Sequence, residues 1–191
     1  MATDPHPHTS FSHPAALTRF FQPSRAFLAA DSTGCDAVAT GALVFSADGR
    51  RLLLVQRAAH DSMPLRWEVP GGACDAAADA TVLHGLAREL REETGLVLRR
   101  VVRALPRPAH VFATRRGLRV AKFYFHVHVD PAVPAVTLDP DEHVGFVWAA
   151  EDECRARSLV TPAGETVELV FTTPEQESLV LDAFRLRRDP S

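Results

Sequence analysis

Residues 67–96 read WEVPGGACDAAADATVLHGLARELREETGL, and the second half of this stretch decides how the chain is interpreted. Glu89, Glu92 and Glu93 stand at positions i, i+3 and i+4, so a helix would place their carboxylates on one face, within contact of one another. Like charges stacked in this way destabilise an isolated helix. A divalent cation that prefers oxygen ligands, such as Mg²⁺, would cancel their repulsion.

The same segment has the other signals of a helix that packs on a core. Leu83, Leu86 and Leu90 recur at helical spacing on another face. Gly95 stands where helices commonly end. We therefore expect a helix over roughly residues 80–94.

A loop precedes the expected helix. Gly71 and Gly72 follow the apolar residues Val69 and Pro70, and such glycines allow the backbone to come close to a ligand. Arg88 could pair with a neighbouring carboxylate and fix its orientation. The alternative for an Arg/Glu run is a solvated helix face, but the Gly-Gly turn and the final glycine favour a functional site.

Residues 88–96, RELREETGL, resemble the second half of the Nudix box of the Nudix hydrolases. The pattern of that family is Gly, five residues, Glu, seven residues, and then Arg-Glu-aliphatic-x-Glu-Glu-x-Gly-aliphatic. The second half matches at every fixed position. The first half differs, because fifteen residues separate Gly72 from Arg88 where the pattern has thirteen. The isolated Glu of the pattern falls on Ala80 when counted back from Arg88, and on Ala78 when counted forward from Gly72.

The missing carboxylate leaves two interpretations open. Asp75 or Asp79 could supply it in the altered loop. Alternatively, Asp79 and Thr81 could cap the helix, as these residue types commonly do. We favour capping.

The resemblance implies an α/β/α sandwich with a mixed β-sheet. It also implies hydrolysis of a diphosphate bond in a nucleoside diphosphate derivative, with Mg²⁺ or Mn²⁺ as cofactor. Glu89, Glu92 and Glu93 would be the metal ligands, with Glu89 as ligand or base, and Arg88 would belong to the catalytic group. Two other functions stay open: a catalytically impaired Nudix-like domain that binds a nucleotide or a protein, and a house-cleaning nucleoside triphosphatase.

Further site residues follow from the same resemblance. Glu142, in a loop before a strand that contains Trp148, is similar to an acidic residue that serves in the family as a further metal ligand or general base. Asp139 and Asp141 could fill that role instead, and His143 is interpreted as structural. Arg57 is similar in position to an arginine that contacts substrate phosphate, and a guanidinium suits that contact because it forks onto two oxygens. Gly71 and Gly72 would contribute backbone contacts to the substrate.

The composition is that of a globular protein. The chain has 191 residues, 46% of them hydrophobic and 24% charged, with a formal net charge of −3. There is no basic footprint, so we expect a small nucleotide diphosphate as substrate and no long nucleic acid as partner. The apolar runs are too short for a membrane span, and the three scattered cysteines indicate a reducing, cytoplasmic location. An organellar presequence is a minor alternative, and a homodimer stays possible.

The remaining patterns predict the order of elements. Residues 1–36 should be a flexible N-terminal tail and arm, with residues 1–14 disordered and the later phenylalanines packed on the domain, which would span residues 37–188. A closing helix is expected at residues 175–187. Strands are expected at residues 37–45, 51–57, 67–69, 97–105, 120–129 and 144–149, the first two as a hairpin or as neighbours.

Overall fold

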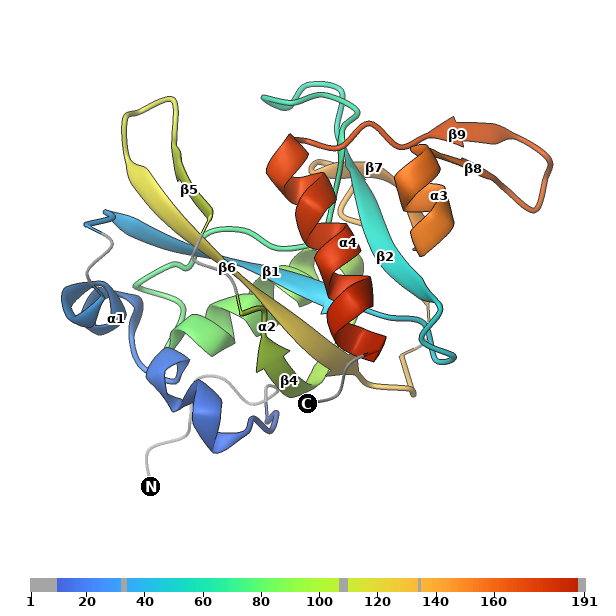
Figure 1. Cartoon of the computed structure of the whole chain (residues 1–191). Helices are drawn as coiled ribbons and strands as arrows, with labels where there is room; N and C mark the ends of the chain where they lie inside the picture. Colours follow the sequence, from blue (N-terminus) through green and yellow to red (C-terminus); the bar gives the residue numbers. More distant parts are fainter. Residues whose placement is uncertain (1–9, 32–33, 107–109, 134, 189–191) are drawn as a thin grey trace.

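The computed structural model describes residues 10–31, 34–106, 110–133 and 135–188 (Figure 1). The helical elements are η1 (Ala15–Phe20), α1 (Ser24–Ala30), α2 (Val82–Thr94), α3 (Glu151–Ala156) and α4 (Pro174–Arg188). The strands are β1 (Ala37–Val44), β2 (Arg51–Arg57), β3 (Trp67–Glu68), β4 (Leu98–Ala104), β5 (His110–Ala113), β6 (Arg119–Val129), β7 (His143–Ala150), β8 (Ser158–Val160) and β9 (Thr166–Glu168). The strands and helices expected from the sequence are all present, with ends shifted by one or two residues.

Most strands belong to two sheets. In the first, the order is β1-β6-β4, with β5 also paired to β6. This sheet is mixed, because β1 runs parallel to β6 while β4 and β5 run antiparallel to it. The second sheet is antiparallel, in the order β3-β2-β7, and β8 pairs with β9 in a separate ribbon.

The strands form a layer between two apolar cores. Side chains alternate across a strand, so in β2 Leu53 packs in the core that contains the apolar face of α2, while Leu52 and Leu54 pack in the core that contains α4. Figure 1 shows α4 lying across the strands on the side away from α2. The expected α/β/α sandwich is therefore confirmed.

The N-terminal arm is part of the domain's core. Phe20 stacks on Phe27 at 5.2 Å between ring centroids and meets the edge of Phe125 at 4.9 Å. The expected packing of the arm's phenylalanines is confirmed for these two. Ser12 donates its N–H to Arg99 O at 3.0 Å and joins β4 in a bridge, so the disorder expected up to residue 14 is wrong for this segment. Residues 1–9 lie outside the described residues.

Of the two arrangements expected for the first two strands, the hairpin is wrong, but the strands are neighbours at one end, where Ser46 donates its N–H to Arg51 O at 2.8 Å. A bridge joins Phe45 to Leu52, but the ladders of β1 and β2 lie in different sheets. Instead, β1 pairs with the long strand β6. Apolar side chains of β6 are buried on both faces of that strand, in the two cores. A local sequence pattern does not distinguish these pairings. The sequence also did not predict β5, α3 or the β8–β9 ribbon.

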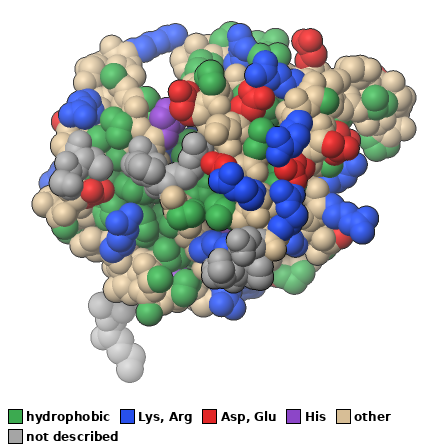
Figure 2. All heavy atoms as spheres, in the orientation of Figure 1, with side chains coloured by type: hydrophobic (Ala, Val, Ile, Leu, Met, Phe, Trp, Pro, Cys, Tyr) green, Lys and Arg blue, Asp and Glu red, His purple; other side chains and the backbone are tan. Residues whose placement is uncertain are grey.

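The face that carries α3 and α4 has both positively and negatively charged side chains. Figure 2 shows Lys and Arg side chains beside Asp and Glu side chains there. Ion pairs link the elements, with Arg188 bound to Glu151 and Arg157 bound to Glu177 at 2.7 Å. Within the described part of the chain, no helix has the length and apolar character needed to cross a membrane.

Candidate metal and active site

Helix α2 is fixed at both ends by its sequence. Thr81 is the N-cap, and its hydroxyl accepts the N–H of His84 at 3.2 Å. At the other end, Gly95 adopts a left-handed conformation with φ of 70° and donates its N–H to Arg91 O at 2.8 Å. The helix begins two residues after its expected start, and its leucine face is buried.

Asp79 has a different role from the one expected. Its Oδ1 accepts Arg88 Nε at 2.9 Å and its Oδ2 accepts Arg88 Nη2 at 3.0 Å, while Oδ2 also accepts the N–H of Asp75 at 2.7 Å. The carboxylate is buried. Helix capping by Asp79 is therefore wrong, because this side chain is turned onto Arg88 and Thr81 alone caps α2. Asp75 is exposed and accepts the N–H of Ala77 at 2.8 Å, which is a turn contact.

Arg88 also orients two of the three helix carboxylates. Its Nη1 donates to Glu92 Oε2 at 2.7 Å, and its Nη2 lies 2.9 Å from Glu89 Oε1. Nη2 further donates to Ala73 O at 3.0 Å, which ties the loop to the helix. The hydrogen bonds to Asp79 are the main cause that raises the pKa of Arg88 above its ordinary value. Arg88 therefore pairs with neighbouring carboxylates, as the sequence suggests.

Glu93 is the most buried of these glutamates. It is 6% exposed, and its Oε2 accepts the N–H of Gly71 at 2.6 Å. Burial raises the pKa of Glu93 to about 8, although the Gly71 N–H and the charge of Lys122 act in the opposite direction. Lys122 Nζ donates to Gly71 O at 3.2 Å. Gly71 has φ of 135°, and a Cβ there would lie 2.3 Å from Thr40 O, so the close approach requires glycine.

Glu89 lies under the second glycine of the loop. A Cβ on Gly72 would be 2.5 Å from Glu89 Oε2. Burial raises the pKa of Glu89 above its ordinary value, against the effect of Arg88. Glu92, by contrast, is 56% exposed at its side chain. The three glutamates thus share one helix face but differ in environment.

The loop before β7 is tied to the end of α2. Thr137 donates its N–H to Thr94 O at 2.9 Å, and Asp139 donates its N–H to Glu93 O at 3.4 Å. His143 then donates its N–H to Asp139 O at 2.9 Å. These contacts bring the start of β7 to the glutamates. Asp139 Oδ1 accepts the N–H of Asp141 at 2.9 Å, which is a turn contact.

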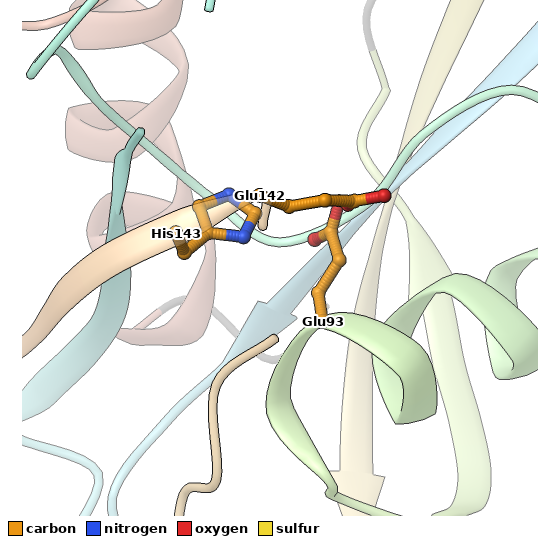
Figure 3. A group of neighbouring side chains, drawn as sticks. All are labelled: Glu93, Glu142 and His143. Atoms are coloured by element: carbon orange, nitrogen blue, oxygen red, sulfur yellow. The ribbon is translucent and has the colours of Figure 1, made fainter. Parts of the chain in front are cut away.

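Glu142 and His143 meet Glu93 at this point. Figure 3 shows the carboxyl groups of Glu93 and Glu142 next to each other, with the imidazole of His143 beside them. One ligand atom from each residue lies within 4.8 Å of the others. Burial, followed by the charge of Asp139, raises the pKa of Glu142, and burial lowers the pKa of His143. A divalent cation fits this donor set, because it would offset the repulsion between the carboxylates.

The guanidinium of Arg57 forms ion pairs with two carboxylates of the protein. Its Nη2 lies 2.5 Å from Asp61 Oδ2, and its Nη1 donates to Glu68. The negative charge of Glu68 is among the causes that raise the pKa of Glu93. Arg57 therefore lies next to the glutamate cluster, where its charge neutralises Glu68.

Glu68 and Lys122 were missed by the sequence reasoning. Both are buried and both act on Glu93 through their charges. The sequence does contain a signal for both residues, because each is a lone charged residue within an apolar strand. Glu68 stands in WEV, and Lys122 stands in VAKFYF. Charged residues are rarely buried unless paired, so such interruptions indicate a site.

Comparisons with known proteins identify the family and the fold. The family model described as the NUDIX domain matches residues 36–170. Similar solved structures include the MutT protein from Methanosarcina mazei Go1, with 20% identity, a TM-score of 0.52, and coverage of 80% of this chain and 95% of that chain. The E. coli ORF135 protein has 20% identity, a TM-score of 0.55, and coverage of 81% and 91%. A C. elegans Ap4A hydrolase has 18% identity, a TM-score of 0.54, and coverage of 80% and 98%.

At these identities, the likeness to the solved structures concerns the fold. A comparison with curated proteins gave no match. The family model is the stronger finding, because it spans well over half of the chain and includes the loop, α2 and the start of β7. The chain therefore belongs to the Nudix family and is a hydrolase that acts on pyrophosphate bonds.

Proposed function

We propose that this Nudix hydrolase cleaves a diphosphate bond in a nucleoside diphosphate derivative, using Mg²⁺ or Mn²⁺ bound by Glu89, Glu92 and Glu93. The observation that carries the proposal is the environment of Glu93. This carboxyl is buried, its pKa is raised to about 8, and other carboxylates contribute to that shift. Such an arrangement is costly for a metal-free protein and favourable around a divalent cation.

The bound cation would neutralise the charge of the diphosphate and lower the pKa of a water that attacks phosphorus. Arg88 holds Glu89 and Glu92 in position through its two Nη atoms. Glu142 is exposed and its pKa is raised by burial and by the charge of Asp139, so its carboxylate is a better proton acceptor than an ordinary glutamate. Glu89 is the alternative proton acceptor, because its pKa is also raised.

The loop supplies the surface for the phosphates. Gly71 donates its N–H to Glu93, and Gly72 lies so close to Glu89 that a Cβ on it would be 2.5 Å from Glu89 Oε2. Lys122 adds a positive charge at Gly71 O. These features fit an anionic group of phosphate size, and the C. elegans neighbour is described as an Ap4A hydrolase. We therefore place a small nucleotide that contains a diphosphate in this site.

The test is a substrate panel with ADP-ribose, dinucleoside polyphosphates and nucleoside triphosphates, in which the nucleotide products are separated and quantified by chromatography after incubation with Mg²⁺ or with EDTA. We expect at least one substrate to be hydrolysed, and only with the metal. Glu93→Gln should lower kcat by about 10²–10³, the usual cost of losing one electrostatic stabiliser at a reaction centre. The matched control is Glu165→Gln, since Glu165 is exposed in the turn between β8 and β9.

Two outcomes would contradict the proposal. Full activity in EDTA would refute the metal dependence. A Glu93→Gln variant as active as the Glu165→Gln control would refute the role of the cluster. If the panel gives no hydrolysis and a nucleotide still binds, the chain is an impaired Nudix-like binding domain.

A further inference from the structure

His143 has a buried imidazole with an unused ring nitrogen. The residue is 4% exposed, and within the described part of the chain its Nδ1 has no hydrogen-bond partner. Leaving a buried polar group unsatisfied costs about 1–3 kcal/mol. Since an apolar side chain would avoid this cost, the position of the imidazole needs a chemical explanation.

The surroundings of His143 supply one. Figure 3 shows its ring beside the carboxyl groups of Glu93, from α2, and Glu142, from the turn just before β7. The ligand atoms of the three residues lie within 4.8 Å of one another. Ligands of one ion with bonds of about 2.0–2.2 Å lie roughly 3–4 Å apart, so a small inward shift would bring all three onto one ion.

The nearby positive charges do not prevent such a site. Arg57 acts on His143 through its charge, but it is paired with Glu68 and Asp61. Two carboxylates and a neutral imidazole leave a net negative charge for the ion. The donors are also mixed, since imidazole nitrogen suits transition metals, whereas oxygen alone suits Mg²⁺.

We propose that Glu93, Glu142 and His143 form a site with two oxygen donors and one nitrogen donor, which binds a first-row transition-metal ion such as Co²⁺ or Zn²⁺ in preference to Mg²⁺. The inference rests on the proposed function in one respect, because Glu93 is a metal ligand in both. With Glu142 bound to the metal, Glu89 is the proton acceptor of that function. It adds a nitrogen ligand and therefore a different metal preference. His143, interpreted from the sequence as structural, is assigned a ligand role.

The first experiment measures metal binding alone, without substrate. Co²⁺ and Mg²⁺ are titrated calorimetrically into the full chain after treatment with EDTA. We expect Co²⁺ to bind at least about tenfold more tightly than Mg²⁺, and His143→Asn to weaken Co²⁺ binding by about tenfold while changing Mg²⁺ binding by less than about twofold. The matched control is His128→Asn, an exposed histidine on β6.

A second measurement needs no variant, which matters because a buried residue such as His143 can affect folding. In the Co²⁺-loaded chain labelled with ¹⁵N-histidine, we expect one imidazole with strong paramagnetic shifts in the NMR spectrum, retained in His128→Asn. Absence of that imidazole signal, or equal affinity for Co²⁺ and Mg²⁺, would overturn the inference. Mg²⁺-dependent hydrolysis could persist in that case, so the proposed function would stand independently.

Discussion

Replacing Asp79 with Asn tests the most specific interaction of the altered loop. The carboxylate forms two hydrogen bonds to Arg88, at 2.9 and 3.0 Å, and its side chain is 3% exposed. Removing one partner of a buried ion pair costs about 3–5 kcal/mol. Arg88 is 26% exposed and keeps Glu89 and Glu92 as partners, so the cost should be smaller, about 2 kcal/mol.

For a chain of this length, about 2 kcal/mol corresponds to a fall in Tm of about 4–8 °C. Thermal unfolding and urea titration of wild type and Asp79→Asn would measure it. The matched control is Asp75→Asn in the same loop, since Asp75 is exposed and we expect less than about 0.5 kcal/mol there. Equal stabilities of Asp79→Asn and Asp75→Asn would show that the ion pair does not hold the loop, and the reasoning would fail.

Three further predictions concern the loop, the arm and the pH dependence. Gly72→Ala should change the free energy of unfolding by less than about 1 kcal/mol but lower kcat by about tenfold or more, because the Cβ of the alanine would displace the flexible carboxylate of Glu89. Unfolding and turnover measured on the same preparation test the two effects. Phe20→Ala should cost about 3–5 kcal/mol in urea unfolding, since this ring is 1% exposed in the core; the exposed Phe21→Ala is its control, and equal costs would contradict the packing. In EDTA, the free energy of unfolding should fall by up to about 4 kcal/mol between pH 4.5 and pH 8, because folded Glu93 keeps its proton up to a pKa of about 8 while the unfolded chain loses it near the ordinary value. Glu93→Gln should remove this contribution to the pH dependence of stability. Identical pH dependences of the variant and the wild type would refute the assignment.

The fold was predictable where one local pattern was sufficient. The leucines of α2 and the stop residue Gly95 predicted that helix, and the short apolar runs predicted the main strands. Pairing was not predictable, because β1 joins β6 across most of the domain and nothing in residues 37–57 indicates this partner. The short β8–β9 ribbon was missed because its strands have three residues each, too few to show a period.

The site was predictable in part for the same reason. Helical spacing brings Glu89, Glu92 and Glu93 together without any tertiary information. The position of Glu142 depends on backbone contacts between residues 137–143 and the end of α2, which no pattern in the sequence describes. Only the resemblance to Nudix hydrolases predicted a role for it.

Counting residues against the family pattern did not predict the ion pair between Asp79 and Arg88. Counting from Gly72 or from Arg88 assumes that every residue between them advances along a fixed path, which holds within a helix but not in a loop two residues longer than the family pattern. The chain folds back, with Asp79 donating its N–H to Asp75 O at 2.7 Å, and this turn directs the carboxylate to Arg88. The buried carboxylate that pairs with Arg88 is thus that of the residue between Ala78 and Ala80. Because Arg88 in turn holds Glu89 and Glu92, the altered loop and the glutamate cluster form one connected unit.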